Sequence, residues 1–224
     1  INVKKFTQVT GAALALDIDN LDTDQIMPKQ FLRGIDKSGL AEGALYFLRF
    51  NPDGSPKAGA VFHKPGFEKA PIIIGGPNFG CGSSREHAVW GLQQMGIDVV
   101  IAPSFGEIFY SNCFNNGLLA AKVSAEDSRR LFKAISTEAP TDVTVDLEAC
   151  TISVPAKGLV ISFAIAPRHR TMLLEGLDMV ESTMKNISEI AAFRAKHEAL
   201  FPWMTGLAGK TARELKARKN DQAP

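Results

Sequence analysis

Residues 71–95 read PIIIGGPNFGCGSSREHAVWGLQQM and contain the transition that decides the fold. A short continuous apolar run at 71–76 predicts a buried strand, and a glycine-rich loop follows it at 77–85. Apolar side chains at helical spacing then predict a helix over 86–95. The stretch therefore predicts one strand–loop–helix unit.

The same rhythm repeats immediately downstream. Strands that alternate with helices indicate parallel strands joined by right-handed crossovers. The predicted elements are a strand over 98–102, a helix over 107–114 stopped by Gly117, a strand over 118–123 and a helix over 124–136 capped by Ser124 with Asp127.

The flanking sequence predicts an antiparallel addition to this parallel core. Residues 6–19 are strand-like, and after Pro140 apolar residues alternate with polar ones over 143–147, 152–154 and 160–165. Helices are expected over 167–175 and 187–200, and the polar stretches 20–34 and 51–69 are expected to be loops.

The predicted fold class is α/β, a layered β/β/α domain with mixed parallel and antiparallel strands. We expect a single domain over 1–204. The charged tail 205–224 has almost no apolar face, so it is expected to be a frayed helix or disordered, and dispensable.

Composition excludes several functional classes. Hydrophobic residues make up 45% and charged residues 22% of the 224, which excludes wholesale disorder. The chain has 25 lysines and arginines against 24 aspartates and glutamates, and this near balance of charge argues against a nucleic-acid groove. No apolar run approaches the roughly 20 residues of a membrane span, and no export signal is expected.

The cysteines argue against a cofactor in this chain. Cys81, Cys113 and Cys150 are widely spaced and contain no CxxC pair, and the histidines lack metal-ligand spacing. We therefore expect no disulfide framework, zinc or iron–sulfur site here, and a reducing, cytoplasmic location.

The loop at 78–88 is the candidate site. Glycines permit tight turns, and free N–H groups at a helix start form an anion site that Ser83, Ser84 and Arg85 would face. An arginine fork suits a carboxylate, and a serine hydroxyl among N–H donors could be stabilised as an alkoxide. The alternative is purely structural, because Ser83-x-x-Glu86 also has the form of a capping box.

Other chemistries have less support in this loop. It lacks the Lys-Ser/Thr ending of a nucleotide P-loop and the glycine spacing of a dinucleotide site. Cys81 is more often a packing residue than a nucleophile in such a setting, and His87 in the first helical turn is more often a packing residue than a metal ligand.

The run Gly-Ser-Ser-Arg-Glu-His-Ala at 82–88 resembles the signature of the swivel domain in the aconitase family. Its longer form, 78–87, resembles the free-standing small subunits of 3-isopropylmalate dehydratases within that family. Agreement extends to residues 20–28, 101–116 and 168–170, so the resemblance covers about 6–204.

The resemblance implies roles for five residues. Ser83 corresponds to the catalytic base, and Ser84 and Arg85 correspond to groups that hold a substrate carboxylate. Asp24 corresponds to an active-site aspartate that helps orient a catalytic histidine of the partner. Arg33 corresponds to an arginine that reads the distal part of the substrate.

The resemblance also implies a reaction and a partner. Family members of this kind interconvert 2-isopropylmalate and 3-isopropylmalate in leucine biosynthesis by dehydration and rehydration. They do so only with a large subunit, which carries the [4Fe-4S] cluster. No cofactor is expected on this chain, and the complex is expected to be a heterodimer or a higher hetero-oligomer.

Three alternatives remain open at this stage. One is the small subunit of a sister dehydratase for homoaconitate, citramalate-type or dimethylmalate substrates. Another is a non-catalytic, anion-sensing subunit in which Ser83 only caps a helix. A serine or cysteine hydrolase ranks last, because Gly-x-Ser-x-Gly is absent around Ser83.

Overall fold

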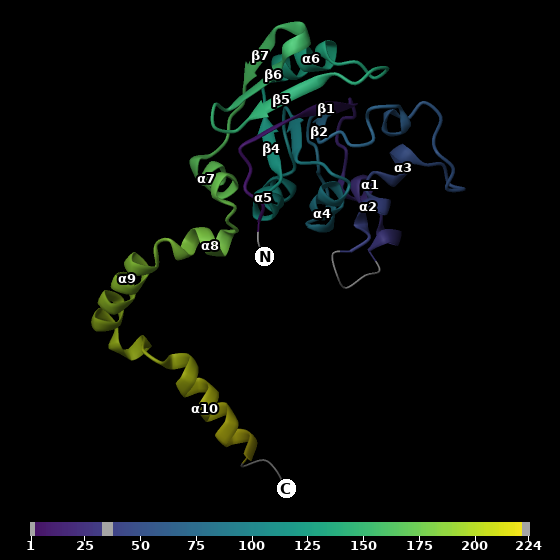
Figure 1. Ribbon diagram of the computed structural model, residues 1–224. Helices are drawn as coiled ribbons and strands as arrows, with labels where there is room; N and C mark the ends of the chain where they lie inside the picture. The colour runs from purple at the N-terminus through teal and green to yellow at the C-terminus, as the bar shows by residue number, and fades with distance from the viewer. Residues whose placement is uncertain (1–2, 33–37, 221–224) are drawn as a thin grey trace. The chain divides into compact units, whose positions relative to one another are not determined.

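The strand predicted after Pro71 is present as β2, Ile72–Gly75, and all four of its residues are buried. The computed structural model in Figure 1 describes residues 3–32 and 38–220. Arg33, which the resemblance assigned to substrate recognition, lies outside the described residues.

Four parallel strands form one half of the sheet, with β4 at its edge. Ile73 of β2 lies opposite Leu14 of one neighbour and Val100 of the other, and all three of these side chains are buried. The predicted strand–helix alternation is confirmed to within a few residues. The elements are β1 (Gln8–Leu16), α4 (His87–Gln94), β3 (Val99–Ala102), α5 (Glu107–Asn116) and β4 (Leu119–Lys122).

Three antiparallel strands extend the sheet from β1. They are β5 (Asp142–Asp146), β6 (Thr151–Val154) and β7 (Leu159–Ser162), with the short 3-10 helix η3 (Pro155–Lys157) before β7. The strand order is β4-β3-β2-β1-β5-β6-β7. Burial alternates along β5 and β6, as the period-two pattern predicted.

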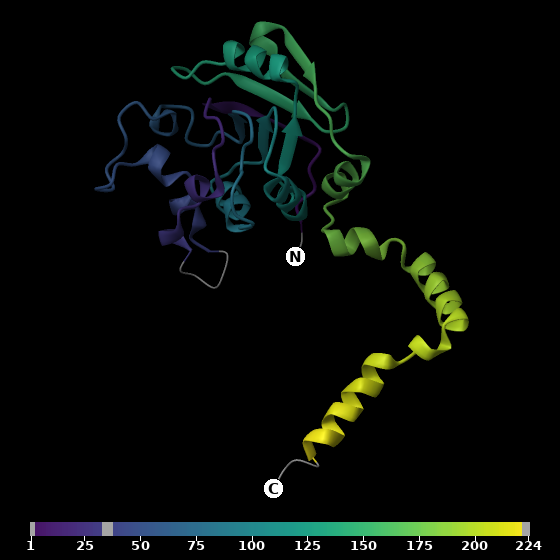
Figure 2. The same cartoon turned by 180° about the vertical axis from the view of Figure 1, so that it is seen from behind.

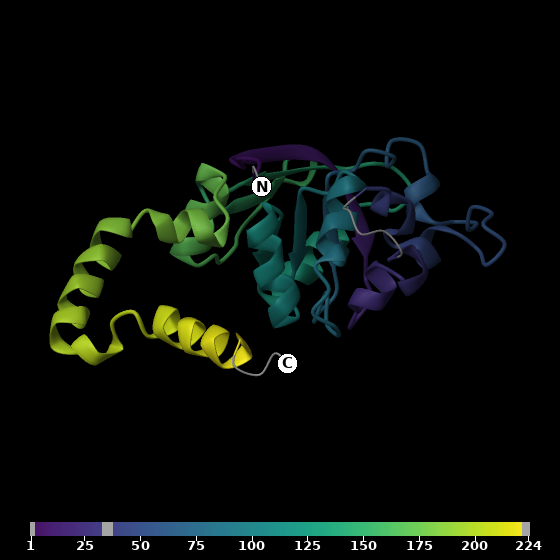
Figure 3. The same cartoon turned by 90° about the horizontal axis from the view of Figure 1, so that it is seen from below.

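The layers are visible in Figures 1, 2 and 3. Helices α4 and α5 cover one side of the parallel strands, and α6 (Ala125–Ala134) lies on the other side with β5–β7. Ser124 caps α6 by accepting a hydrogen bond from the Asp127 N–H, at 3.0 Å. The predicted layered α/β fold of mixed strands is confirmed.

The two stretches expected to be loops, and residues 38–50 between them, contain short helices. Four-residue helices carry too little periodicity to be recognised in sequence. Arg49 joins α3 to α2, because its Nη1 donates to the carbonyls of Ala41 and Ala44, both at 2.9 Å. The elements are α1 (Thr23–Ile26), η1 (Lys29–Phe31), α2 (Leu40–Gly43), α3 (Tyr46–Arg49) and η2 (Val61–His63).

The described chain separates into two compact units, 1–179 and 180–224. The first ends after α7 (Pro167–Glu175), which stops at Gly176 as predicted. Within the described residues, the regular elements of the second unit are all helices, and the tail expected to be frayed or disordered contains the helix α10. The prediction that one domain extends to residue 204 stays a prediction. The remaining elements are α8 (Met179–Met184), α9 (Ile187–Leu200), η4 (Pro202–Met204) and α10 (Leu207–Asn220).

Among the helices in the described part of the chain, none has both the length and the hydropathy that crossing a membrane requires.

Candidate active site

The candidate site lies where the loops after three parallel strands meet. The carboxyl ends of parallel strands share one edge of a sheet, which brings their loops together. Gly80 N donates to Leu21 O at 2.7 Å, joining the loop after β2 to the loop after β1. On its other side, Phe79 N donates to Ser104 O at 3.1 Å and Gly106 N donates to Phe79 O at 2.9 Å. The glycine-rich loop is therefore held from both sides.

Three residues of this loop, Asn78, Gly80 and Gly82, have positive φ. Gly80 has φ +73°, and a Cβ there would lie 2.2 Å from Cγ of the buried Phe109. Asn78 has φ +58°, and its Nδ2 donates to Asn20 Oδ1 at 2.8 Å. Glycine avoids the steric cost of this conformation, and asparagine tolerates it best among the other residues. The path of the backbone therefore requires glycine at position 80 and favours asparagine at position 78.

Ser83 is half-buried and is contacted by a threonine from α1. The two hydroxyl oxygens, Ser83 Oγ and Thr23 Oγ1, are 3.0 Å apart. Ser83 N donates to Thr23 Oγ1 at 3.0 Å, and Thr23 Oγ1 is 3.3 Å from Ser83 O. Thr23 is only 1% exposed. The predicted catalytic serine is therefore fixed by a side chain from a different loop.

The capping-box interpretation of Ser83 is wrong. Helix α4 begins at His87, its N-cap residue is Glu86, and no side chain caps it. A capping box is present instead on α1, where Gln25 N donates to Asp22 Oδ1 at 2.7 Å and Asp22 N donates to Gln25 Oε1 at 3.0 Å. Ser83 has no capping role that would explain its place.

Two further predicted residues are adjacent in space. Arg85 Nη1 forms an ion pair with Asp24 Oδ1, joining the glycine-rich loop to α1. Arg85 is half-buried and Asp24 is exposed. Ser84 is also exposed, and its carbonyl accepts a weak hydrogen bond from Asn112 Nδ2 at 3.4 Å. Three of the five predicted residues therefore lie on the glycine-rich loop, and a fourth, Asp24 of α1, contacts it.

A group of hydrogen bonds centred on Asn116 was not predicted from the sequence. Asn116 of α5 donates to Glu86 Oε1 at 2.6 Å and accepts from Trp90 Nε1 at 2.8 Å, both on the α4 side. The His87 ring lies 4.7 Å from that of Trp90, which agrees with a packing role. Thr23 was missed as well. Both residues fall in stretches that carry the family resemblance, and that was the available signal.

The surface beside Ser83 is hollowed. The cavity has a volume of about 260 Å³, and its lining residues are Gly80, Cys81, Gly82, Ser83, Gly106, Glu107 and Ile108. Cys81 Sγ lies 3.4 Å from Asn20 O, a contact typical of a packed thiol. Burial raises the pKa of the Cys113 thiol well above its ordinary value.

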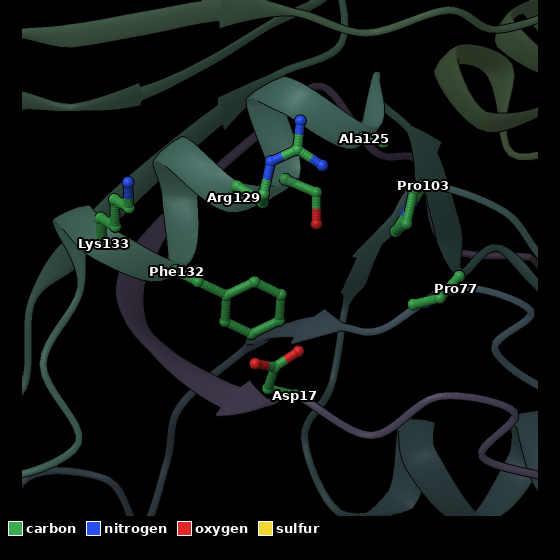
Figure 4. A pocket seen from close by; sticks show the side chains of 8 residues that line it. Asp17, Pro77, Pro103, Ala125, Arg129, Phe132 and Lys133 are labelled. Carbon is green, nitrogen blue, oxygen red and sulfur yellow. The ribbon is translucent and has the colours of Figure 1, made fainter.

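A larger cavity of about 410 Å³ lies elsewhere, beside α6 (Figure 4). None of the predicted site residues lines it. Its lining residues are Asp17, Pro77, Pro103, Ala125, Ser128, Arg129, Phe132 and Lys133.

Comparison with known proteins agrees with this architecture. The family model for the aconitase C-terminal domain matches residues 3–126, and a second, described as LeuD_N, matches residues 129–167. A 3-isopropylmalate dehydratase small subunit of Chromobacterium violaceum is 50% identical over 209 residues, which is 93% of this chain and 98% of that protein. The corresponding subunit of Brucella anthropi is 47% identical over 199 residues, 89% and 98% of the two chains.

A solved structure shares the fold at lower identity. It is a 3-isopropylmalate dehydratase chain of Methanocaldococcus jannaschii, with a TM-score of 0.60 and 29% identity over 84% of this chain and 99% of that one. The chain therefore belongs to the family of 3-isopropylmalate dehydratase small subunits, which is built on the aconitase C-terminal domain.

Proposed function

We propose that this chain is the small subunit of a 3-isopropylmalate dehydratase, which interconverts 2-isopropylmalate and 3-isopropylmalate by loss and re-addition of water. The observation that carries the proposal is the convergence of Ser83, Arg85 and Asp24 at one sheet edge, in a chain that is 50% identical to such a subunit over almost its whole length.

Ser83 is proposed to be the base. A proton beside a carboxylate is weakly acidic, so the developing charge must be stabilised by fixed donors. Ser83 lines the cavity, and its Oγ is positioned by a hydrogen bond with Thr23 Oγ1, as a general base must be. Ser83 would act as the alkoxide: its Oγ would accept the proton from the substrate carbon and become a hydroxyl, while the electron pair of the broken C–H bond forms the alkene and hydroxide leaves the adjacent carbon.

Arg85, with Ser84, is proposed to hold a substrate carboxylate. Arg85 already binds a carboxylate, that of Asp24, so a substrate carboxylate would replace a group of the same charge and geometry. Asp24, released from this pair, would then be available to orient a histidine of the large subunit. Arg33 is proposed to contact the distal part of the substrate, which would set the preference among malate derivatives.

The donor set of this chain does not fit an iron–sulfur cluster. Cys113 is buried in the core, Cys81 and Cys150 belong to other elements, and no group of three metal-ligating side chains exists among the described residues. We therefore propose that the [4Fe-4S] cluster, which would act as the Lewis acid for the leaving hydroxide, belongs to the large subunit of a cytoplasmic hetero-oligomer.

The experiment is reconstitution. The purified chain alone should be colourless, iron-free and inactive on 2-isopropylmalate, and activity should appear when the cluster-loaded large subunit is added. Homoaconitate, citramalate and dimethylmalate serve as comparison substrates, and a higher kcat/KM for one of them would reassign the subunit to a sister dehydratase. Stoichiometric cluster binding by the isolated chain would contradict the proposed division of roles.

A further inference from the structure

Thr23 is an unusual residue in this fold. Within the described residues, Thr23 and Ser128 are the two buried polar side chains. A buried hydroxyl is unfavourable unless it is hydrogen-bonded, and the contacts of Thr23 Oγ1 all go to a single residue, Ser83. This concentration of contacts on the proposed base indicates a role beyond packing.

The hydrogen-bond capacity of a hydroxyl limits how these contacts can be made. A threonine hydroxyl has one proton and two acceptor lone pairs. The Ser83 N–H donates to Thr23 Oγ1, so one lone pair is used. The Thr23 proton can then point either to the Ser83 carbonyl oxygen, at 3.3 Å, or to Ser83 Oγ, at 3.0 Å.

The protonation state of Ser83 decides between these two arrangements. While Ser83 carries its proton, its hydroxyl can donate to Thr23 Oγ1, and Thr23 can donate to the Ser83 carbonyl. Once Ser83 is an alkoxide it can only accept, so the Thr23 hydroxyl must turn toward Oγ. The change needs rotation about one Cβ–O bond and no movement of heavy atoms.

The main chain keeps Thr23 in place during this change. Thr23 N donates to Cys81 O at 2.8 Å, and Asp22 pairs with Cys81 in an isolated parallel bridge. The capping box of α1 fixes the residues on either side. Gly82 lies directly opposite, with φ +99°, and a Cβ there would come within 3.3 Å of Thr23 Oγ1.

We propose that Thr23 is a positioning residue for Ser83 that also donates a hydrogen bond to the Ser83 alkoxide. It holds Ser83 in place beside the cavity, and its hydroxyl proton turns from the Ser83 carbonyl to Oγ when the serine is deprotonated. The inference rests on the proposed function and assigns to α1 a part in lowering the pKa of the base.

The test uses the complete complex with the large subunit. Thr23→Val keeps the shape but removes the hydroxyl, so kcat should fall by about 10- to 100-fold, the effect of one hydrogen bond to a charged group, with KM changed less than about twofold. The acidic limb of the kcat–pH profile should move to higher pH, because an alkoxide without its donor forms less readily. Thr23→Ser should restore kcat to within about threefold and return the limb to its original place.

A double-mutant cycle separates this role from a structural one. In a Ser83→Ala background, Thr23→Val should cause no further loss of kcat, because the group it acts on is absent. Thermal denaturation of each variant gives the folded fraction, and Thr23→Ala serves as a second hydroxyl-free variant should valine disturb folding. A Thr23→Val complex with unchanged kcat per folded molecule, or serine that fails to rescue, would overturn the inference.

The kcat values of the wild-type and Ser83→Ala complexes test the proposed function itself. An inactive wild-type complex would overturn that function together with this inference. An active wild-type complex whose Ser83→Ala variant remains active would refute Ser83 as the base. An active complex in which only the Thr23 variants behave normally would refute the inference alone.

Discussion

Replacing Ser83 with alanine separates catalysis from stability, because the structure shows which contacts would be lost. The Oγ–Oγ contact with Thr23, at 3.0 Å, disappears. The Ser83 N–H can still donate to Thr23 Oγ1 at 3.0 Å, and Thr23 can still donate to the Ser83 carbonyl at 3.3 Å. The buried Thr23 hydroxyl therefore keeps partners for donation and acceptance.

The expected loss of stability is small. Removing one part-buried hydrogen bond lowers the free energy of unfolding by about 0.5–1.5 kcal/mol. In a unit of this size, about 1 kcal/mol corresponds to a decrease in Tm of about 2–4 °C. Helix α4 should be unaffected, since Ser83 does not cap it.

The expected loss of activity is large. Removing a general base lowers kcat by at least ~10²-fold, and KM should change little because the group acts as the transition state is reached. The assay measures kcat and KM of the reconstituted complex alongside thermal denaturation of the variant subunit. A near-normal kcat per folded complex would refute the assignment of Ser83 as the base, whatever the change in Tm.

Three further predictions concern single residues. Arg85→Lys keeps the charge but loses the bidentate fork, so steady-state kinetics should show a higher KM and a lower kcat together, and a change in only one would contradict a carboxylate clamp. Gly80→Ala should lower the free energy of unfolding in urea by about 2–5 kcal/mol, because it combines a left-handed φ of +73° with a Cβ 2.2 Å from the Phe109 ring. The matched control is Gly39→Ala, with φ +72° and no described atom within 4 Å, which should lose only about 1–2 kcal/mol. Burial, and secondarily the adjacent Arg168, lower the pKa of His169 below its ordinary value of 6.5. The unfolded chain therefore binds more protons than the folded chain near and below this pH, and the free energy of unfolding decreases as the pH falls. His169→Phe should therefore show a smaller decrease in Tm than the wild type between about pH 7.5 and about pH 5.5, and equal decreases would contradict this.

The sequence by itself determined most of the secondary structure and the location of the site. Continuous apolar runs predicted β2, β3 and β4, and alternation predicted the antiparallel strands, because burial of one or both faces imposes these patterns on neighbouring residues. Residues 78–87 pointed to the site for an equally local reason, since glycines and polar residues at a strand–helix junction form an anion-binding loop. The four-residue helices were missed because they span too little chain to show a period.

Only the tertiary structure decided how the site is assembled. The sequence allowed Ser83 to cap a helix. In the structure α4 begins at His87, and Ser83 instead forms a hydrogen bond with Thr23, which is 60 positions away in the chain. The same step brings Asp24 to Arg85, a distance of 61 positions. Both contacts follow from the parallel pairing of β1 with β2, which sets the two loops side by side. Periodicity reports which face of an element is buried, but it contains no information about which loops share a sheet edge, and the catalytic geometry depends on that arrangement.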